Sequence, residues 1–103
     1  MTNKAFTRYL EEMQNKTVET LKNKAKEYAT CDDRLHNFRV AAKLQDITEK
    51  QALGGMMAKH IVSVYDMIGS LDVFPRDLWE EKIKDSINYL FLLWAMVCES
   101  SEG

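Results

Sequence analysis

A line of acidic and amide side chains near the end of the sequence has a spacing that suits chemistry. On a helix, with about 100° per residue, one face of this segment carries Asp77, Glu81, Asp85 and Asn88. Beyond Asn88 the same line enters the apolar run 89–97. We therefore expect the first residues of the line to be exposed and its end to be shielded from water, with Asp85 at the boundary.

A second polar line is expected one helix earlier, where Lys59, Ser63 and Asp66 pass between apolar residues. A lysine in such surroundings needs an oppositely charged partner, because an unpaired buried charge is strongly destabilising. We therefore predict an ion pair between Lys59 and Asp85. The pair has two interpretations: it sets the register of two helices and does no chemistry, or it faces a ligand.

The elements that position these side chains are predicted to be four helices, because apolar residues recur every three or four positions and no strand pattern is present. The expected segments are about 3–28, 35–44, 49–69 and 75–99. The turn "ATCDD" ends the first segment, and Asp32 or Asp33 can cap the second. Residues 1–103 are thus predicted to form a single all-α domain, a helical bundle of three long helices and one short helix.

The third segment has the clearest boundaries. Thr48 and Gln51 have the spacing of a capping box, and Gly69 suits a helix end. Inside this segment Gly54 and Gly55 lower helix propensity, so we expect them to permit the close approach of a neighbouring helix.

Composition excludes several classes of protein. With 103 residues, 46% hydrophobic and 29% charged, the chain is long enough for one domain with a core of its own. A net charge of -2 argues against nucleic acid or an anionic membrane as the main partner. The apolar run "INYLFLLWAMVC" is shorter than the roughly 20 residues that a membrane-spanning helix needs. The start "MTNKAFTRYLEEMQ" shows no secretory signal, so we expect Cys31 and Cys98 to be reduced cytoplasmic thiols.

Four short segments, "LKNKAKEYA", "DDRLHNF", "MMAKHI" and "EKIKDSINYLFLL", occur in this order between residues 21 and 95. This pattern resembles small phage-encoded proteins of the MazG-like family. The resemblance implies an all-α fold, a nucleotide-related role in the cytoplasm of a bacterial host, and assembly as dimers or tetramers. Together with the polar lines, it gives a candidate ligand-binding set: Tyr28, Arg34, Asn37, Lys59, Glu81, Asp85 and Asn88.

The chain departs from that family at the metal site. The related hydrolases hold magnesium with E-x-x-E on one helix and E-x-x-D on the next, because hard cations need several carboxylate oxygens. Here Glu81 and Asp85 are spaced by four, and the middle helix carries Lys59 and His60 in place of acids. We therefore expect no cofactor, and magnesium-dependent hydrolysis of nucleoside triphosphates that is absent or very slow. If the chain is an enzyme, it is a pyrophosphohydrolase of this kind.

Two functions from different classes remain open. In the first, a pocket between the third and fourth helices binds a nucleotide or a related phosphorylated small molecule, with Tyr28 and Trp79 available for stacking, Lys59 and Arg34 for charge. In the second, the chain is a non-enzymatic helical module that binds a host or phage protein. A thermal-shift screen with nucleotides separates the two, because only a binder is stabilised.

The apolar run 89–97 also predicts assembly. Its side chains point in every direction around the helix, and a chain of this size has too few helices to surround them. We therefore expect a homodimer or a dimer of dimers, held in part by Leu92, Leu93 and Met96.

Overall fold

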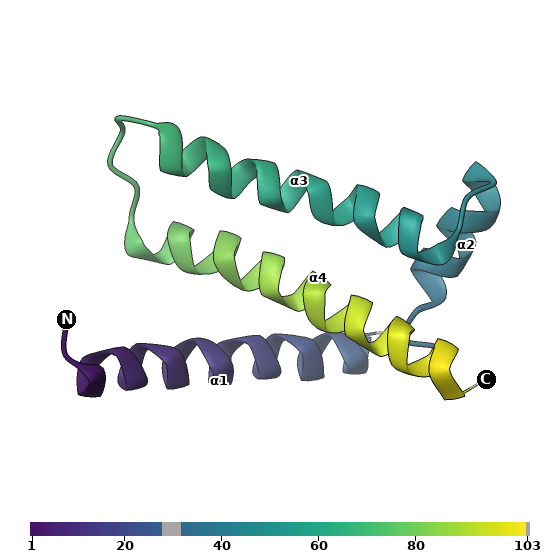
Figure 1. Cartoon of the computed structure of the whole chain (residues 1–103), viewed down its shortest axis with the longest axis horizontal. Helices are drawn as coiled ribbons and strands as arrows, with labels where there is room; N and C mark the ends of the chain where they lie inside the picture. The colour runs from purple at the N-terminus through teal and green to yellow at the C-terminus, as the bar shows by residue number, and fades with distance from the viewer. Residues whose placement is uncertain (28–31, 103) are drawn as a thin grey trace.

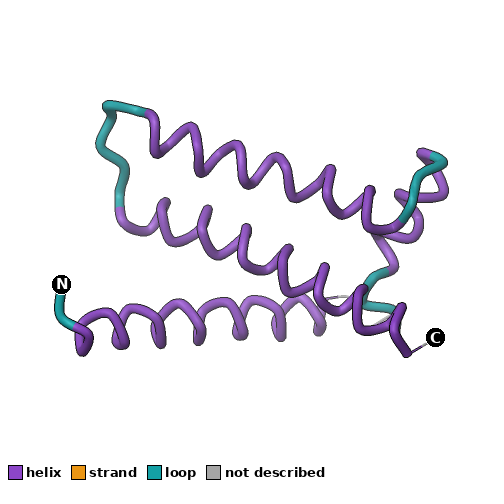
Figure 2. Tube along the Cα trace, viewed as in Figure 1, coloured by secondary structure: helices purple, strands orange, loops and turns teal. Residues whose placement is uncertain are grey.

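The computed structural model describes residues 1–27 and 32–102, and the side chains of 1–24 and 32–101. Within these ranges the chain forms four helices and no strand (Figures 1 and 2). The helices are α1 (Asn3–Glu27), α2 (His36–Gln45), α3 (Glu49–Gly69) and α4 (Arg76–Glu102). The predicted all-α architecture, with three long helices and one short helix, is confirmed. None of the described helices is both long enough and apolar enough to cross a membrane.

The long helices form an open layer with α4 in the middle. Figure 1 shows α3 on one side of α4 and α1 on the other, and in the described residues α1 and α3 do not pack against each other. Helix α2 packs on α3 at one end of the layer. Helix α3 runs antiparallel to α4, whereas α1 runs parallel to it. This parallel register matches the ion pairs Glu12–Arg76 and Lys16–Glu80, which advance by four residues on both helices.

The hydrophobic core is small and lies at the α2 end of the layer. Its fully buried members are Leu35, Phe38, Leu53 and Met96. Partly buried apolar side chains pack around them: Met56, Met57, Tyr89, Leu92 and Leu93. The prediction that Met96 contacts another copy of the chain is therefore wrong, because its own chain covers it. Residues Leu92 and Leu93 also direct much of their surface into this core.

Local sequence chemistry sets the limits of α3. The Thr48 hydroxyl accepts a hydrogen bond from the Gln51 backbone N–H at 3.1 Å, and the Gln51 side chain accepts one from the Thr48 N–H at 2.9 Å. The predicted capping box is thus confirmed, as is the helix end at Gly69. Pro75 lies directly before α4, where its missing N–H costs no helical hydrogen bond.

The start of α2 differs from the prediction. Leu35 occupies the N-cap position and has no capping side chain. The Asp33 carboxylate instead accepts a hydrogen bond from the Leu35 N–H at 3.0 Å, and the Asp33 carbonyl accepts one from the His36 N–H at 3.1 Å. Asp33 therefore stabilises the turn that precedes the helix, because its short side chain reaches the backbone two residues ahead.

The glycine pair in α3 also differs from the prediction. A Cβ atom added at Gly54 or Gly55 would meet nothing within 4 Å. The pair is therefore not at a close helix–helix contact within this chain, and the prediction of one is wrong. The core side of α3 is formed instead by residues such as Leu53, whose side chain is completely buried.

One arginine joins three parts of the chain at the α2 end. The Arg39 guanidinium contacts Asp33 at 2.7 Å, Glu49 at 3.5 Å and Glu99 of α4. Partial burial lowers the pKa of Arg39, but the hydrogen bond to Glu99 and the three carboxylate charges outweigh it and raise the pKa above its ordinary value. Arg39 thereby holds α2 against the start of α3 and the end of α4.

Candidate functional site

A pocket of about 170 Å³ lies where the end of α1, the α2 region, and the middle of α3 and α4 meet. Its polar and aromatic lining comes from all of these parts of the chain: Lys24, Arg34, Asn37, Phe38, His60, Asp85, Asn88 and Tyr89. Most of these residues are far apart in the sequence. The fold therefore gathers cationic, acidic, amide and aromatic side chains around one small volume.

Asn88 is the most unusual residue of this pocket. It is only 5% exposed, and neither its side-chain nitrogen nor its side-chain oxygen has a hydrogen-bond partner among the described residues. Buried polar atoms are nearly always paired, and leaving one unpaired costs about 1–3 kcal/mol. The amide therefore requires a partner that these residues do not provide.

The exposure gradient along α4 explains how Asn88 comes to be buried. Asp77 and Glu81 are exposed, Asp85 is partly buried and Asn88 is buried. This is the order predicted from the point at which the polar line enters the apolar run. The line thus leads from solvent into the pocket, and Glu81, one turn before Asp85, lies outside it.

Asp85 lies beside His60 in the pocket lining. The His60 Nδ1 and Asp85 Oδ2 atoms are 3.7 Å apart, too far for a good hydrogen bond, so they form an ion pair only when the imidazole is protonated. The predicted pair between Lys59 and Asp85 is wrong, because Lys59 is exposed and does not line the pocket. A step of one residue turns the helix by about 100°, and this step directs His60 toward α4 in place of Lys59.

Aromatic rings form one wall of the pocket. The rings of His60 and Tyr89 lie with their centroids 4.8 Å apart and are tilted by 33°. Phe38 meets the Tyr89 ring edge-on, at 6.3 Å and 73°. Such contacts favour a fixed ring position, so this wall is held by packing from both α2 and α3.

Two cationic side chains also line the pocket, Lys24 from α1 and Arg34 from the segment before α2. The Arg34 guanidinium donates a hydrogen bond to the Leu21 carbonyl at 2.8 Å, which ties this segment to α1. A guanidinium has five N–H donors, so Arg34 keeps donors for another group. Lys24 is exposed at the rim. The pocket therefore combines a cationic rim with a buried amide and a single carboxylate, that of Asp85.

The structure brings together four of the seven residues of the predicted ligand-binding set, namely Arg34, Asn37, Asp85 and Asn88. Lys59 and Glu81 point to solvent, and Tyr28 lies outside the described residues. Sequence reasoning did not place His60 and Tyr89 in the site. Tyr89 could have been predicted, because it directly follows the predicted site residue Asn88. Nothing in the sequence distinguished His60 from the neighbouring Lys59.

A pair of magnesium ions does not fit the side chains at this pocket. In the described part of the chain, no three His, Cys, Asp or Glu side chains come together in a way that could hold a metal ion. Asp85 has a histidine as its titratable neighbour, and hard cations prefer several carboxylate oxygens. The described lining of the pocket therefore lacks the set of carboxylate ligands that a magnesium site needs.

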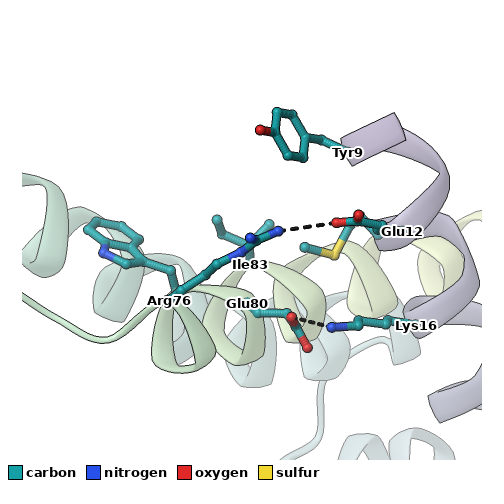
Figure 3. A pocket seen from close by; sticks show the side chains of 8 residues that line it. Tyr9, Glu12, Lys16, Arg76, Glu80 and Ile83 are labelled. Carbon is teal, nitrogen blue, oxygen red and sulfur yellow. Dashed lines mark hydrogen bonds and ion pairs between the residues drawn. The ribbon is translucent and has the colours of Figure 1, made fainter. Parts of the chain in front are cut away.

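A second cavity, of about 360 Å³, lies between α1 and the first turns of α4. Figure 3 shows Arg76 reaching Glu12 and Lys16 reaching Glu80 across it, and the Arg76–Glu12 distance is 3.1 Å. Because these four charges are already paired, we interpret the cavity as part of the packing between α1 and α4.

Trp79 lines this cavity and does not line the pocket around Asn88. The predicted stacking role of Trp79 at the site is therefore wrong.

No family model matches the chain. No characterised protein and no solved structure matches it either. The resemblance to MazG-like proteins therefore rests only on the short segments that carry it.

Proposed function

We propose that the pocket around Asn88 binds a nucleotide or a related phosphorylated small molecule without hydrolysing it efficiently. The observation that carries the proposal is the buried Asn88 amide, whose nitrogen and oxygen have no hydrogen-bond partner among the described residues. A primary amide offers donors and an acceptor side by side. Its natural complement is a planar edge with an adjacent acceptor and donor, as nucleobases have.

The size and charge of the pocket favour a ligand of which one part is enclosed and the other part extends out of the cavity. Whole ligand sites usually measure about 300–1,000 Å³, so a pocket of about 170 Å³ encloses only one part of such a molecule. The enclosed part is the base, beside Asn88 and the aromatic wall. The phosphorylated part extends toward Arg34 and Lys24, because guanidinium and ammonium groups bind phosphate oxygens.

Binding without efficient hydrolysis follows from the side chains near Asp85. Among the described residues that line the pocket, Asp85 is the single carboxylate, and it lies beside a histidine. Hydrolysis of a triphosphate requires strong stabilisation of negative charge, which the related hydrolases obtain from metal ions held by several carboxylates. A role in the cytoplasm of a bacterial host, suggested by the resemblance, stays a prediction.

Thermal unfolding with nucleoside mono-, di- and triphosphates, with and without magnesium, tests the proposal. A ligand at 100 times its Kd stabilises the protein by about 2.7 kcal/mol. We expect at least one nucleotide to raise Tm in the parent protein and in Asn15→Leu, an exposed asparagine away from the pocket, but not in Asn88→Leu. If no nucleotide raises Tm, or if Asn88→Leu responds like the parent, the proposal is wrong.

Pyrophosphate release measured with the same nucleotides tests the second half of the proposal. We expect no release above background at micromolar protein. Rapid magnesium-dependent release that Asp85→Asn abolishes would show that the carboxylate supports catalysis.

The exposed apolar surface favours a second candidate function, a helical module that binds another protein. Large apolar side chains such as Tyr65, Ile68 and Trp94 are more than half exposed. Isolated soluble monomers rarely expose such residues as a continuous patch. This candidate predicts a protein that forms a complex with another protein through these side chains and shows no response to nucleotides.

A further inference from the structure

The chain exposes more surface than a compact protein of its mass. Its accessible surface is 7876 Å², whereas a folded monomer of 12.0 kDa is expected to expose about 6,000 Å². Its radius of gyration is 15.9 Å, compared with about 13 Å for a compact domain of this length. The excess surface of about 1,900 Å² agrees with the open layer, in which α1 and α3 do not pack against each other in the described residues.

An apolar stripe runs along the side of α4 that faces away from the core. Its exposed members, spaced by three, four and seven residues, are Ile83, Leu90, Trp94 and Val97. Leu90 is 51% exposed and Trp94 is 65% exposed. The segment 86–98 contains no charged residue, so covering this stripe would desolvate no charge on α4.

A groove of about 340 Å³ lies beside this stripe, between α3 and α4. Tyr65 and Ile68 form its α3 side, and Ile83, Ile87 and Leu90 form its α4 side. The groove and the protruding Trp94 therefore belong to neighbouring parts of one surface. We refer to the stripe and the groove together as the outer face.

We infer that a second copy of the chain covers the outer face, in a two-fold dimer with its axis near Leu90. Antiparallel pairing of the two α4 helices about this axis places residues that follow Leu90 opposite residues that precede it. Trp94 then lies beside the partner's Ser86, at the groove, and Val97 lies beside the partner's Ile83. Each copy inserts a tryptophan and receives one, which is the self-complementary contact that two-fold symmetry requires.

The exposed area agrees with this occupant. Obligate homodimers bury about 1,000–2,500 Å² per subunit, and the excess surface of the whole chain, about 1,900 Å², is large enough to include an interface of this size. The outer face contains both the protruding Trp94 and the groove that receives it. Two identical copies can therefore complement each other through this face alone. This inference does not depend on the nucleotide site, which lies on the core side of α4.

Light scattering coupled to size-exclusion chromatography at micromolar concentration tests the inference. We expect a mass of about 24 kDa, twice the 12.0 kDa of the chain. Trp94→Glu should weaken the dimer at least tenfold and yield a mass near 12 kDa at low micromolar concentration. The matched control Leu44→Glu alters a residue that is exposed at the end of α2, away from the outer face, and should remain dimeric.

Cross-linking keeps the test valid if Trp94→Glu fails to fold. Two copies of residue 90 meet near the axis, so Leu90→Cys in a Cys31→Ser, Cys98→Ser background should form a disulfide-linked dimer under mild oxidation. Val62→Cys in the same background changes a residue of similar exposure that does not line the groove, and it should cross-link poorly. A monomeric parent protein, or preferential cross-linking at residue 62, overturns the inference.

Discussion

Replacing Asn88 with leucine should stabilise the protein while removing its response to nucleotides. The substitution replaces two buried polar atoms, which have no partner among the described residues, with apolar atoms of similar bulk. An unpaired buried polar group costs about 1–3 kcal/mol, so we expect Asn88→Leu to raise the free energy of unfolding by about this amount. For a domain of this length each kcal/mol corresponds to about 4–8 °C in Tm.

Urea unfolding followed by circular dichroism measures this effect, at one fixed protein concentration because association also contributes to stability. Asn15→Leu, at an exposed position, should change stability by less than about 0.5 kcal/mol. Asn88→Asp should destabilise the protein at pH 7, because it places a second carboxylate near Asp85 in a buried position. That loss should shrink at low pH, where the new carboxyl is protonated.

The result that refutes this reasoning is a destabilisation by Asn88→Leu of more than about 1 kcal/mol. Such a loss would mean that the amide is hydrogen-bonded in the free protein and is not held ready for a ligand. A stabilised Asn88→Leu variant that still binds nucleotides would show that the buried amide is unpaired but is not part of the binding site.

Three further predictions concern stability. Thr48→Ala removes the capping box of α3 and should lower the free energy of unfolding by about 1 kcal/mol in urea. Gly55→Ala adds a methyl group that meets nothing and should raise it by about 1 kcal/mol, unless the position is in contact with another chain. The hydrogen bond from Lys16 lowers the pKa of Glu80 below its ordinary value of about 4.5. Glu80→Gln should therefore be less stable than the parent above pH 4.5, and the difference should vanish as pH falls through the lowered pKa.

Sequence patterns predicted the features that depend on neighbouring residues. The capping box at Thr48 and the helix end at Gly69 need only local backbone geometry, and both were confirmed. The change from exposed Glu81 to buried Asn88 was also predicted. It follows from the position in the sequence at which the line of polar residues enters the apolar run 89–97.

Features that depend on how helices are rotated against each other were not predictable. Whether Lys59 or His60 lies next to Asp85 depends on the rotation of α3 about its own axis, and one residue corresponds to about 100°. The periodicity of α4 contains no information about this rotation. The segment 89–97 is apolar on all sides, so its sequence could not show that Met96 faces the core while Trp94 faces outward. Only the placement of the α2 region and α3 distinguishes the two directions, because Leu35, Phe38 and Leu53 form the core with Met96.

The parallel arrangement of α1 and α4 has a consequence for the way the molecule opens. Among the described residues α4 is the one helix on which α1 packs, through contacts such as Glu12–Arg76 that join residues 64 positions apart, and Thr17 is the one buried side chain of α1. Elements with few buried apolar contacts open locally at a lower free energy than the core does. Amide hydrogens of α1 should therefore exchange before those of the α3–α4 hairpin. Since Leu21 and Lys24 line the pocket around Asn88, the same opening would remove part of its lining and give the proposed ligand a path to Asn88 without unfolding the rest of the chain.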